Sequence, residues 1–307
     1  AYQRVKANKG AAGVDRVTLE AFERNLKNNL YKIWNRMSSG SYLPGAVRLV
    51  EIPKGDGKTR PLGIPTVGDR VAQMVVVLLL EPLLEPHFHT DSYGYRPGKS
   101  AHDALSTAKQ RCRAYRWAID LDISRFFDTI DHELLSKALD RHTTNPWMRL
   151  YIDRWLASPY QRQDGSKIER SRGVPQGSVI GPLLANLFLH YVFDEWMKRV
   201  NPKISFERYA DDIVCHCSTQ WEAEAVLLAI EQRLKVCKLA LNQAKTRLVY
   251  CKDSNRKQQW STIQFDFLGH TFRPRAVKSA VGRYFTGFNP AISAKALKRI
   301  SETIRSW

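Results

Sequence analysis

The sequence predicts an α+β fold, in which helices and strands build one mixed structure. Three observations lead to this prediction. Apolar residues recur at helical spacing in residues 18–40, apolar and polar residues alternate in residues 117–123 and 204–217, and segments rich in glycine and proline separate these patterns. The chain has 307 residues, more than one ordinary domain core needs, so we expect two or three subdomains.

The first part of the chain contains helix and strand patterns in turn. Residues 18–40 should form one helix, with Thr18 as the N-cap and Gly40 as its end. Two strand patterns follow in residues 47–65, around a turn at Gly55, Asp56 and Gly57. The elements expected next are a helix at 69–80, an irregular loop at 89–103 and a second helix through Arg113.

The second part continues this alternation. A strand at 117–123 precedes a helix that Asp131 can cap. Residues 173–197 should form a Gly/Pro loop that leads into an apolar helix. The remaining expected elements are a strand pair at 204–217, a helix at 221–238, strands at 247–251 and 263–272, and an amphipathic helix at 293–307.

The charge of the chain points to a polyanionic partner. It contains 48 Lys and Arg against 30 Asp and Glu, a net charge of +18. A field of this size attracts extended polyanions, of which nucleic acid is the commonest. A ribosome-associated protein or one that binds an anionic membrane surface would also be basic, and charge alone leaves these alternatives open.

Cysteine usage and hydropathy indicate a cytoplasmic location without a membrane partner. The five cysteines form no CxxC pair, which favours reduced thiols in a cytosolic setting. Cys215-His216-Cys217 does not match the usual zinc spacing, and successive strand residues point to opposite faces. The longest apolar run, Met74–Leu80, is far shorter than the roughly 20 residues that span a bilayer. The chain begins without Met and ends within a helical pattern, so we expect a fragment or trimmed chain.

Aspartates on two predicted strands are the candidate metal-binding residues. Asp211 and Asp212 lead directly into an apolar strand, although two adjacent carboxylates repel each other and cost several kcal/mol when buried unpaired. On the strand 117–123, Asp120 and Asp122 share the face opposite a row of apolar residues. If these strands lie side by side, three or four carboxylates meet, and divalent cations must neutralise them. Oxygen ligands without accompanying histidines select Mg²⁺.

Two Mg²⁺ ions about 3.5–4 Å apart are the usual apparatus of phosphoryl transfer. The alternative is that these residues are ordinary turn and cap aspartates. That alternative suits Asp128, Asp131 and Asp140, which lie at helix edges, but it does not suit a pair that enters an apolar strand. The sequence therefore predicts a metal-dependent site on a hairpin tip.

The motif YADD at 209–212 resembles the signature of reverse transcriptases, and five further motifs follow the order of that family. The sequence is most similar to proteins encoded by bacterial group II introns. The matching motifs are KGAAGVD, IPKGDGKTRPLGIPTVGDR, GVPQGSVIGPLLANLFL, LNQAKT and FLGH. The resemblance covers nearly the whole chain. One departure is Gly181, which stands where the family usually has Ser before PLLAN.

The resemblance implies a right-hand polymerase fold with fingers, a palm built on an antiparallel sheet, and only the start of the thumb. An N-terminal extension and fingers would occupy residues 1–116 and the palm residues 117–275, with the two interleaved around 160–181. Residues 276–307 would connect to the thumb and maturase region.

The resemblance also implies catalytic roles. Asp122 would bind the first metal with help from the backbone carbonyl of Ile123, while Asp211 would bridge both ions and Asp212 would lie nearer the primer. The ions would be two Mg²⁺, with Mn²⁺ as a substitute. Lys245 would protonate the departing pyrophosphate as a general acid. The alternative for Lys245 is a surface lysine that follows a turn.

Five residues match the family's dNTP site. Lys54 and Arg60 would grip the triphosphate, although Lys58 could take the place of Lys54, and all of these could be solvated turn charges. The remaining matches are Phe127, which would exclude a ribose 2′-hydroxyl, and Gln176 with Gly177, which would pack against base and nucleotide. The alternative for Phe127 is a core residue beside Phe126.

Primer and template contacts follow from two motifs. Phe267, Leu268 and Gly269 match the primer grip, where glycine would admit the primer backbone, or else Gly269 lies in an ordinary strand bulge. Arg96 would either contact template phosphate or brace the fingers. Asp120 has no required role in the family and would stand beside the metal site rather than in it.

The resulting prediction is an RNA-directed DNA polymerase that acts on an RNA template, intron RNA, dNTPs and a DNA or RNA primer, coupled in the natural protein to intron splicing and mobility. One alternative is a maturase scaffold that binds RNA and polymerises little. Another is a domesticated reverse transcriptase, either CRISPR-associated or from an antiviral system. The oligomeric state is open, with a homodimer as one option.

Overall fold

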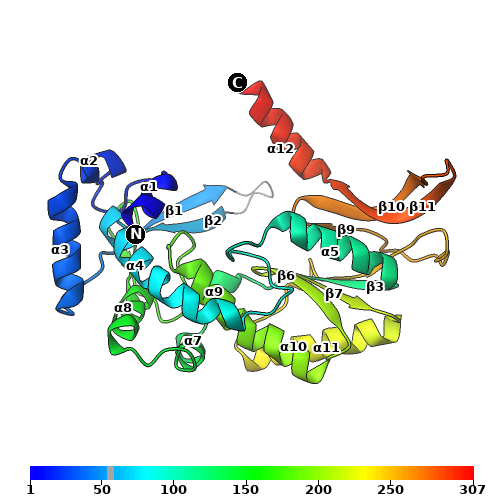
Figure 1. The fold of residues 1–307 in the computed structure, drawn as a ribbon, viewed down its shortest axis with the longest axis horizontal. Helices are drawn as coiled ribbons and strands as arrows, with labels where there is room; N and C mark the ends of the chain where they lie inside the picture. The colour runs from blue at the N-terminus through cyan, green and yellow to red at the C-terminus, as the bar shows by residue number, and fades with distance from the viewer. Residues whose placement is uncertain (54–58) are drawn as a thin grey trace. The chain divides into compact units, whose positions relative to one another are not determined.

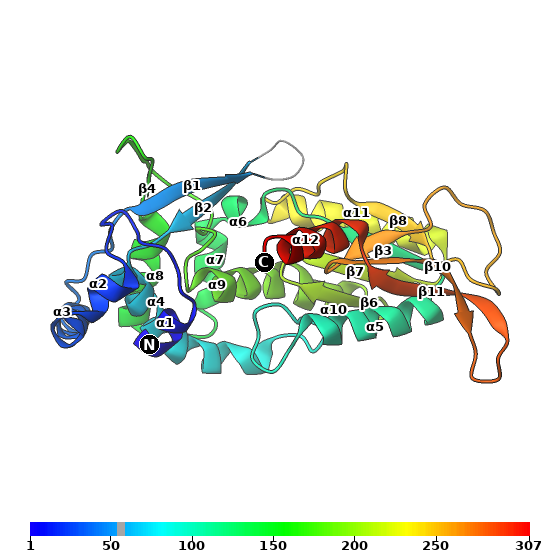
Figure 2. The ribbon, with the colours of Figure 1, turned by 90° about the horizontal axis from the view of Figure 1, so that it is seen from above.

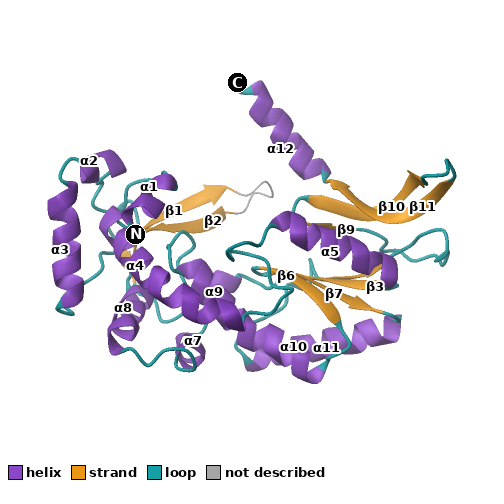
Figure 3. Cartoon of the chain, in the orientation of Figure 1, coloured by secondary structure: helices purple, strands orange, loops and turns teal. Residues whose placement is uncertain are grey.

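A computed structural model describes residues 1–53 and 59–307 (Figure 1). The predicted turn at 55–57, and with it Lys54 and Lys58, lies outside the described residues. The chain divides into two compact units, each built from two separate stretches. Unit 1 comprises Ala1–Phe88 and Arg125–Phe188, and unit 2 comprises His89–Ser124 and Leu189–Trp307. Helices and largely antiparallel sheets occur in both units, which confirms the predicted α+β class (Figure 3).

Unit 1 combines a small sheet with helices. Its sheet has the order β2-β1-β4-β5, in which β1 pairs antiparallel with β2 and parallel with β4. The elements are α1 (Tyr2–Ala7), α2 (Leu19–Glu23), α3 (Leu26–Ser38), β1 (Val47–Pro53), β2 (Thr59–Ile64), α4 (Val67–Leu84), η1 (Glu85–His87), α6 (Phe126–Thr129), α7 (His132–Leu139), α8 (Pro146–Ala157), β4 (Tyr160–Gln161), β5 (Lys167–Ile168) and α9 (Gly181–Leu189).

The helix α4 forms the buried centre of unit 1. Apolar side chains such as Val67, Val76 and Leu80 on it are fully buried. Its start is set by Thr66, whose hydroxyl oxygen accepts a hydrogen bond from the backbone N–H of Asp69 at 3.0 Å. The helix is therefore longer at both ends than the predicted 69–80.

The prediction of a single helix over residues 18–40 was wrong. Two helices, α2 and α3, occupy this segment, because Asn25 leaves the helical region at φ −128°. The side-chain amide of Asn29 donates to the backbone carbonyl of Phe22 at 2.8 Å, which satisfies a carbonyl at the break. The predicted N-cap is confirmed, since the Thr18 hydroxyl accepts from the Ala21 N–H at 3.2 Å.

Unit 2 is built on a four-stranded antiparallel sheet of order β6-β7-β3-β8, which places β3 between β7 and β8. Its remaining strands form a second sheet of order β11-β10-β9. The elements are α5 (Ala101–Ala114), β3 (Trp117–Leu121), η2 (His190–Asp194), α10 (Glu195–Val200), β6 (Ser205–Tyr209), β7 (Asp212–Cys217), α11 (Gln220–Val236), β8 (Arg247–Tyr250), β9 (Phe265–Phe267), β10 (His270–Lys278), β11 (Tyr284–Ile292) and α12 (Ala294–Arg305).

Helices cover both faces of the central sheet (Figure 1). On one face, α5 packs between the sheet and β11, and a core of buried side chains fills this layer, including Ala108, Val214, Val249 and Phe272. On the other face, α11 packs against β3 and β7. The β10–β11 hairpin extends past the C-terminal end of α5 (Figure 2).

Most of the predicted elements of unit 2 are confirmed, with two exceptions. The single strand expected over residues 263–272 is two antiparallel strands, β9 and β10, because the chain reverses direction at Leu268 and Gly269. The apolar helix expected after the Gly/Pro loop, within residues 173–197, is interrupted by η2, a π-helical turn over His190–Asp194. Such turns insert an extra residue into a helix and are frequent at functional sites. Within the part of the chain that the structure describes, no helix is both long and apolar enough to cross a bilayer.

Candidate active site

The predicted aspartates come together at one end of the central sheet in unit 2. Strands β3 and β7 pair antiparallel, and the last pair in the register is Leu121 with Ile213. One step further, Asp122 and Asp212 therefore lie next to each other, with Asp211 in the turn just before β7. A pocket of about 260 Å³ opens at this end, and its lining includes Asp120, Asp122 and Asp212.

The pKa values of two carboxylates in this pocket, Asp120 and Asp212, are raised. The surrounding protein desolvates Asp212 and, together with repulsion from Asp211 and Asp122, raises its pKa to about 6. Burial raises the pKa of Asp120 to about 7, and the negative charge of Asp212 adds to this effect. Burial and mutual repulsion thus both disfavour the charged forms of these carboxylates.

Two residues of one loop hold Asp122. The Lys245 ammonium lies 2.9 Å from one carboxylate oxygen, and the side-chain amide of Asn242 donates to the other at 3.0 Å. The backbone N–H of Asn242 also donates to the carbonyl of Asp122 at 2.8 Å. The structure therefore brings Lys245 and Asp122 together, as the sequence analysis expected of residues in one site.

A metal-binding cluster is not preformed among the residues that the structure describes. Among residues 1–53 and 59–307, no group of three His, Cys, Asp or Glu side chains is arranged to hold a metal ion. Ile123 is buried and bridges to Leu241 across the strand end. Cys215 and Cys217 are buried thiols, and no disulfide forms among the five described cysteines.

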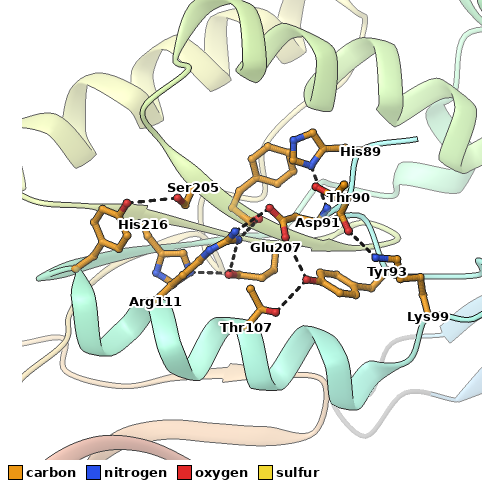
Figure 4. Close-up of polar contacts among 12 residues, drawn as sticks. His89, Thr90, Asp91, Tyr93, Lys99, Thr107, Arg111, Ser205, Glu207 and His216 are labelled. Carbon is orange, nitrogen blue, oxygen red and sulfur yellow. Dashed lines mark hydrogen bonds and ion pairs between the residues drawn. The ribbon is translucent and has the colours of Figure 1, made fainter. Parts of the chain in front are cut away.

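A buried charge network, which the sequence analysis missed, supports the hairpin that carries Asp211 and Asp212 (Figure 4). Glu207 on β6 and His216 on β7 are both fully buried, and His216 Nε2 lies 2.6 Å from Glu207 Oε2. Arg111 on α5 donates to Glu207 Oε1 and to Asp91 Oδ2, both at 2.8 Å. The network ties the hairpin to α5 and to the loop after residue 88.

The signal for this network was present in the sequence. Glu207 and Arg208 are adjacent on one strand, so their side chains point to opposite faces of the sheet. Two neighbouring charges that are buried on opposite faces each require a partner from a different element. The sequence shows this requirement but does not identify the partners, which lie far away along the chain.

In unit 1, two of the residues predicted to bind dNTP form a hydrogen-bonded group. The guanidinium of Arg60 on β2 donates to the side-chain carbonyl of Gln176, whose amide lies 3.4 Å from the carboxylate of Asp128. The Gln176 backbone carbonyl accepts from the N–H of Gly63 at 2.7 Å. The loop around residue 176 is therefore held against β2.

Gly177 and Phe127 are positioned by the same loop. At Gly177, φ is +108°, and an added Cβ would lie 2.6 Å from the carbonyl oxygen of Gly63, so only glycine fits. Phe127 is buried in α6, its ring centroid lies 5.3 Å from that of Phe126, and its backbone carbonyl accepts from Val174. This placement agrees with a core position, and a role in sugar selection stays a prediction.

The predicted primer and template residues lie in unit 2. Leu268 and Gly269 both have positive φ, 48° and 77°, and form the two-residue turn between β9 and β10, directly after the buried Phe267. The guanidinium of Arg96 donates to the backbone carbonyls of His89 and Ser92 at 2.6 and 2.7 Å. These contacts brace the loop, and contact between Arg96 and template phosphate stays a prediction.

Comparisons with known proteins identify the family. Residues 52–272 match the family model described as Reverse transcriptase (RNA-dependent DNA polymerase). Protein YkfC of Escherichia coli is 34% identical in an alignment 304 residues long; the match covers 86% of this chain and 77% of that protein.

Two further relatives are named for introns. The group II intron-encoded protein LtrA of Lactococcus lactis subsp. cremoris is 35% identical over 211 residues, or 68% of this chain and 34% of LtrA. The mitochondrial Nuclear intron maturase 1 of Arabidopsis thaliana is 31% identical over 77 residues, 25% of this chain and 11% of that protein. The chain belongs to the reverse transcriptase (RNA-dependent DNA polymerase) family, among the relatives of group II intron-encoded proteins.

Proposed function

We propose that this chain catalyses RNA-templated DNA synthesis with two Mg²⁺ ions held by Asp122, Asp211 and Asp212. The observation that carries the proposal is the meeting of these aspartates at the end of β3 and the β6–β7 hairpin, in a chain of the reverse transcriptase family. In this proposal unit 2 contributes the palm sheet, residues of unit 1 belong to the fingers, and α12 begins the connection to the thumb.

The donor set fits hard divalent cations. The side chains at this end of the sheet offer carboxylate oxygens, and burial together with repulsion from Asp211 and Asp122 raises the pKa of Asp212, so bound cations would favour its ionised form. Asp122, Asp211 and Asp212, with the Ile123 carbonyl, would hold the ions, and Mn²⁺ could replace Mg²⁺. Bound ions would activate the primer 3′-hydroxyl and stabilise the leaving pyrophosphate.

The chain's own residues would supply binding and a proton. Lys245 is a partly exposed ammonium at the edge of the pocket, from which its Nζ could donate a proton to pyrophosphate. In unit 1, Arg60 and the loop of Gln176 and Gly177 would bind the triphosphate and base of the incoming dNTP. The Phe127 ring would exclude ribonucleotides, and the turn Phe267–Gly269 would contact the primer.

The proposed partners are an RNA template, intron RNA and a DNA or RNA primer, in a cytoplasmic protein that also assists splicing and mobility. The chain spans about three quarters of the Escherichia coli relative but about a third of LtrA, so these whole-protein activities are proposals. The net charge of +18 also favours a second candidate function, an RNA-binding scaffold with little polymerase activity. Either function could be carried out by a monomer or by a homodimer.

The two candidates are separated by primer extension on an RNA template with dNTPs and Mg²⁺, together with an RNA-binding assay on the same protein. Asp211→Asn keeps the size of the side chain and removes its charge. We expect extension to fall by roughly 10³-fold, because several kcal/mol of metal-dependent stabilisation are lost, while RNA binding persists.

The matched control is Asp153→Asn, which removes one charge from an exposed aspartate on α8 of unit 1. We expect this variant to extend primers like the wild type. Equal extension by Asp211→Asn and Asp153→Asn would contradict the polymerase proposal. Tight RNA binding without extension by any of the proteins would establish the scaffold instead.

A further inference from the structure

A buried arginine lies directly before the YADD motif. The side chain of Arg208 on β6 and that of Asp194, the last residue of η2, are both 0% exposed. Arg208 Nε donates to Asp194 Oδ1 at 2.7 Å, and Nη2 donates to Oδ2 at 2.6 Å. This bidentate geometry fixes the plane of the guanidinium as well as its position.

The remaining nitrogen of the same guanidinium reaches the catalytic turn. Arg208 Nη1 lies 3.1 Å from the backbone carbonyl of Ala210. Ala210 has φ +57°, a left-handed conformation that costs a residue with a Cβ about 1 kcal/mol. The conformation of Ala210 sets the direction in which the chain enters Asp211 and Asp212, and the hydrogen bond from Arg208 holds it.

A second segment closes the turn from another side. The backbone around residues 91–94 runs beside β6, with Tyr93 N–H donating to the Arg208 carbonyl at 2.8 Å. At Gly94 an added Cβ would lie 2.5 Å from the backbone nitrogen of Ala210. The turn is thus enclosed by Gly94 and by the Arg208 side chain, so it has little freedom to relax.

The π-helical turn η2 presents the carboxylate that orients Arg208. Asp194 lies at the end of η2, and Arg233 on α11 donates to the backbone carbonyls of Tyr191 and Val192 in this turn, both at 3.0 Å. Arg233 therefore stabilises the same turn without contacting the catalytic hairpin. This difference between two arginines provides a matched comparison.

Stability alone does not account for the Arg208–Asp194 pair. Replacing a buried ion pair with apolar side chains of similar volume is often neutral or stabilising, because desolvation offsets the attraction between the charges. We propose that Arg208 is a positioning residue for the metal-binding aspartates: Asp194 orients its guanidinium, and Nη1 fixes the Ala210 turn that sets Asp211 and Asp212. The proposal rests on the proposed function, since the metal-binding role of these aspartates is part of it.

The test compares Arg208→Lys with Arg233→Lys. Lysine keeps the charge but cannot bind both Asp194 oxygens and the Ala210 carbonyl in one plane. Mn²⁺ binding is measured directly by the loss of its free electron paramagnetic resonance signal, and primer extension is measured against Mg²⁺ concentration. For Arg208→Lys we expect a loss of about 10-fold or more in Mn²⁺ affinity and in kcat, with the KM for dNTP unchanged. Arg233→Lys should remain within about 2-fold of the wild type.

A second variant separates positioning from stability. In the double variant Arg208→Met with Asp194→Leu, apolar side chains replace the buried pair, so we expect thermal stability close to that of the wild type. The same variant should lose Mn²⁺ affinity and kcat as Arg208→Lys does, because the hydrogen bond from Arg208 to the Ala210 carbonyl is then lost. If the double variant does not fold, the comparison of the two lysine variants decides the matter.

The outcomes distinguish this inference from the proposed function. Equal Mn²⁺ affinity in Arg208→Lys, Arg233→Lys and the wild type would overturn the positioning role and leave the polymerase proposal intact. A wild type that binds Mn²⁺ but does not extend primers would overturn the polymerase proposal, while a weaker Arg208→Lys would still support positioning. A wild type that binds no Mn²⁺ would overturn both.

Discussion

At the scale of single residues, Asp122 illustrates how the chain stabilises a carboxylate that is proposed to bind metal ions as well. Lys245 and Asn242 satisfy both of its oxygens, yet 61% of the lysine side chain is exposed to solvent. Ion pairs of exposed lysines contribute little free energy, typically below about 1 kcal/mol. Lys245 can therefore leave Asp122 at small cost, which suits a residue whose proposed task is to deliver a proton elsewhere.

Phe127 carries the prediction about sugar selection. In Phe127→Ala, removal of the ring should admit ribonucleotides, so we expect the ratio of kcat/KM for dNTP over NTP to fall roughly 10- to 200-fold. Loss of a buried Phe also destabilises the fold, by about 3–5 kcal/mol. Phe126→Ala, at the neighbouring buried position, controls for this packing loss. An unchanged ratio in Phe127→Ala would leave Phe127 with a packing role only.

His142 carries a prediction about pH. Burial lowers the pKa of His142 below its usual 6.5, and the neighbouring His87, whose ring centroid lies 4.6 Å away, adds to the effect. The unfolded chain therefore binds this proton at a higher pH than the folded one, so the contribution of His142 to stability is present above pH 6.5 and is lost as the pH falls through the folded pKa.

The measurement is the free energy of unfolding by urea between pH 5 and 7.5. In His142→Gln this part of the pH dependence should be absent, so the variant should lose less stability than the wild type on acidification. His102→Gln, at an exposed position on α5, controls for the removal of a histidine as such. If His142→Gln loses as much free energy of unfolding on acidification as the wild type does, His142 is not the source of this pH dependence.

At the scale of elements, tight turns position the proposed functional residues. The loop at Gly177 is pressed against Gly63 of β2, the Ala210 turn presents Asp211, and the Leu268–Gly269 turn joins β9 to β10. Each turn contains a residue with positive φ, which for Ala and Leu is a conformation that the surrounding structure must hold. At Gly177 and Ala210 the holding contacts come from outside the turn, from Gly63 of β2 and from the Arg208 side chain.

Gly177→Ala tests the closeness of the loop to β2. We expect a loss of stability of roughly 2 kcal/mol or more, since the added methyl both strains a positive φ and collides with the Gly63 carbonyl, and we expect a higher KM for dNTP. Gly165→Ala is the matched control, because Gly165 has φ +86° but nothing within 4 Å of an added Cβ. If the two variants behave alike in stability and KM, the collision with β2 has no consequence.

Local signals in the sequence predicted many of these elements. The caps at Thr18 and Asp131, the strand pair with Asp211 and Asp212 at its tip, and the strand of Asp122 follow from side-chain chemistry and periodicity within short segments. The break at Asn25 and the π-helical turn η2 were missed, because each depends on hydrogen bonds that the local pattern does not record.

The same reasoning applies to the candidate site. Asp122 and Lys245 could be placed in one site because the resemblance to reverse transcriptases named both. The partners of Arg208 and Glu207 could not, since Asp194, Arg111 and His216 reach them only after the sheet and its covering helices have formed. Buried charges thus indicated that partners must exist, and the tertiary structure identified them.

At the scale of the whole molecule, the excess of positive charge sets the conditions for nucleic-acid binding. The net charge is +18, and contacts that neutralise phosphates release counterions from RNA. If 6–10 phosphates are contacted, we expect RNA affinity to fall by roughly 10³- to 10⁵-fold between 50 and 200 mM salt. Filter binding or fluorescence anisotropy across this range measures the slope, and an affinity that does not change with salt would contradict the interpretation of the charge.

The central position of β3 has a consequence for the synthesis of this protein. β3 pairs with β7 on one side and β8 on the other, and both follow it by roughly 90 residues or more. At the usual ribosomal rate of about 5–20 residues per second, the apolar strand of Trp117, Ile119 and Leu121 must wait on the order of 10 s for its neighbours to be made. During that time the nascent chain exposes an apolar strand that has no hydrogen-bonded neighbour on either edge. Recombinant yield should therefore increase when a chaperone that binds extended apolar segments is co-expressed.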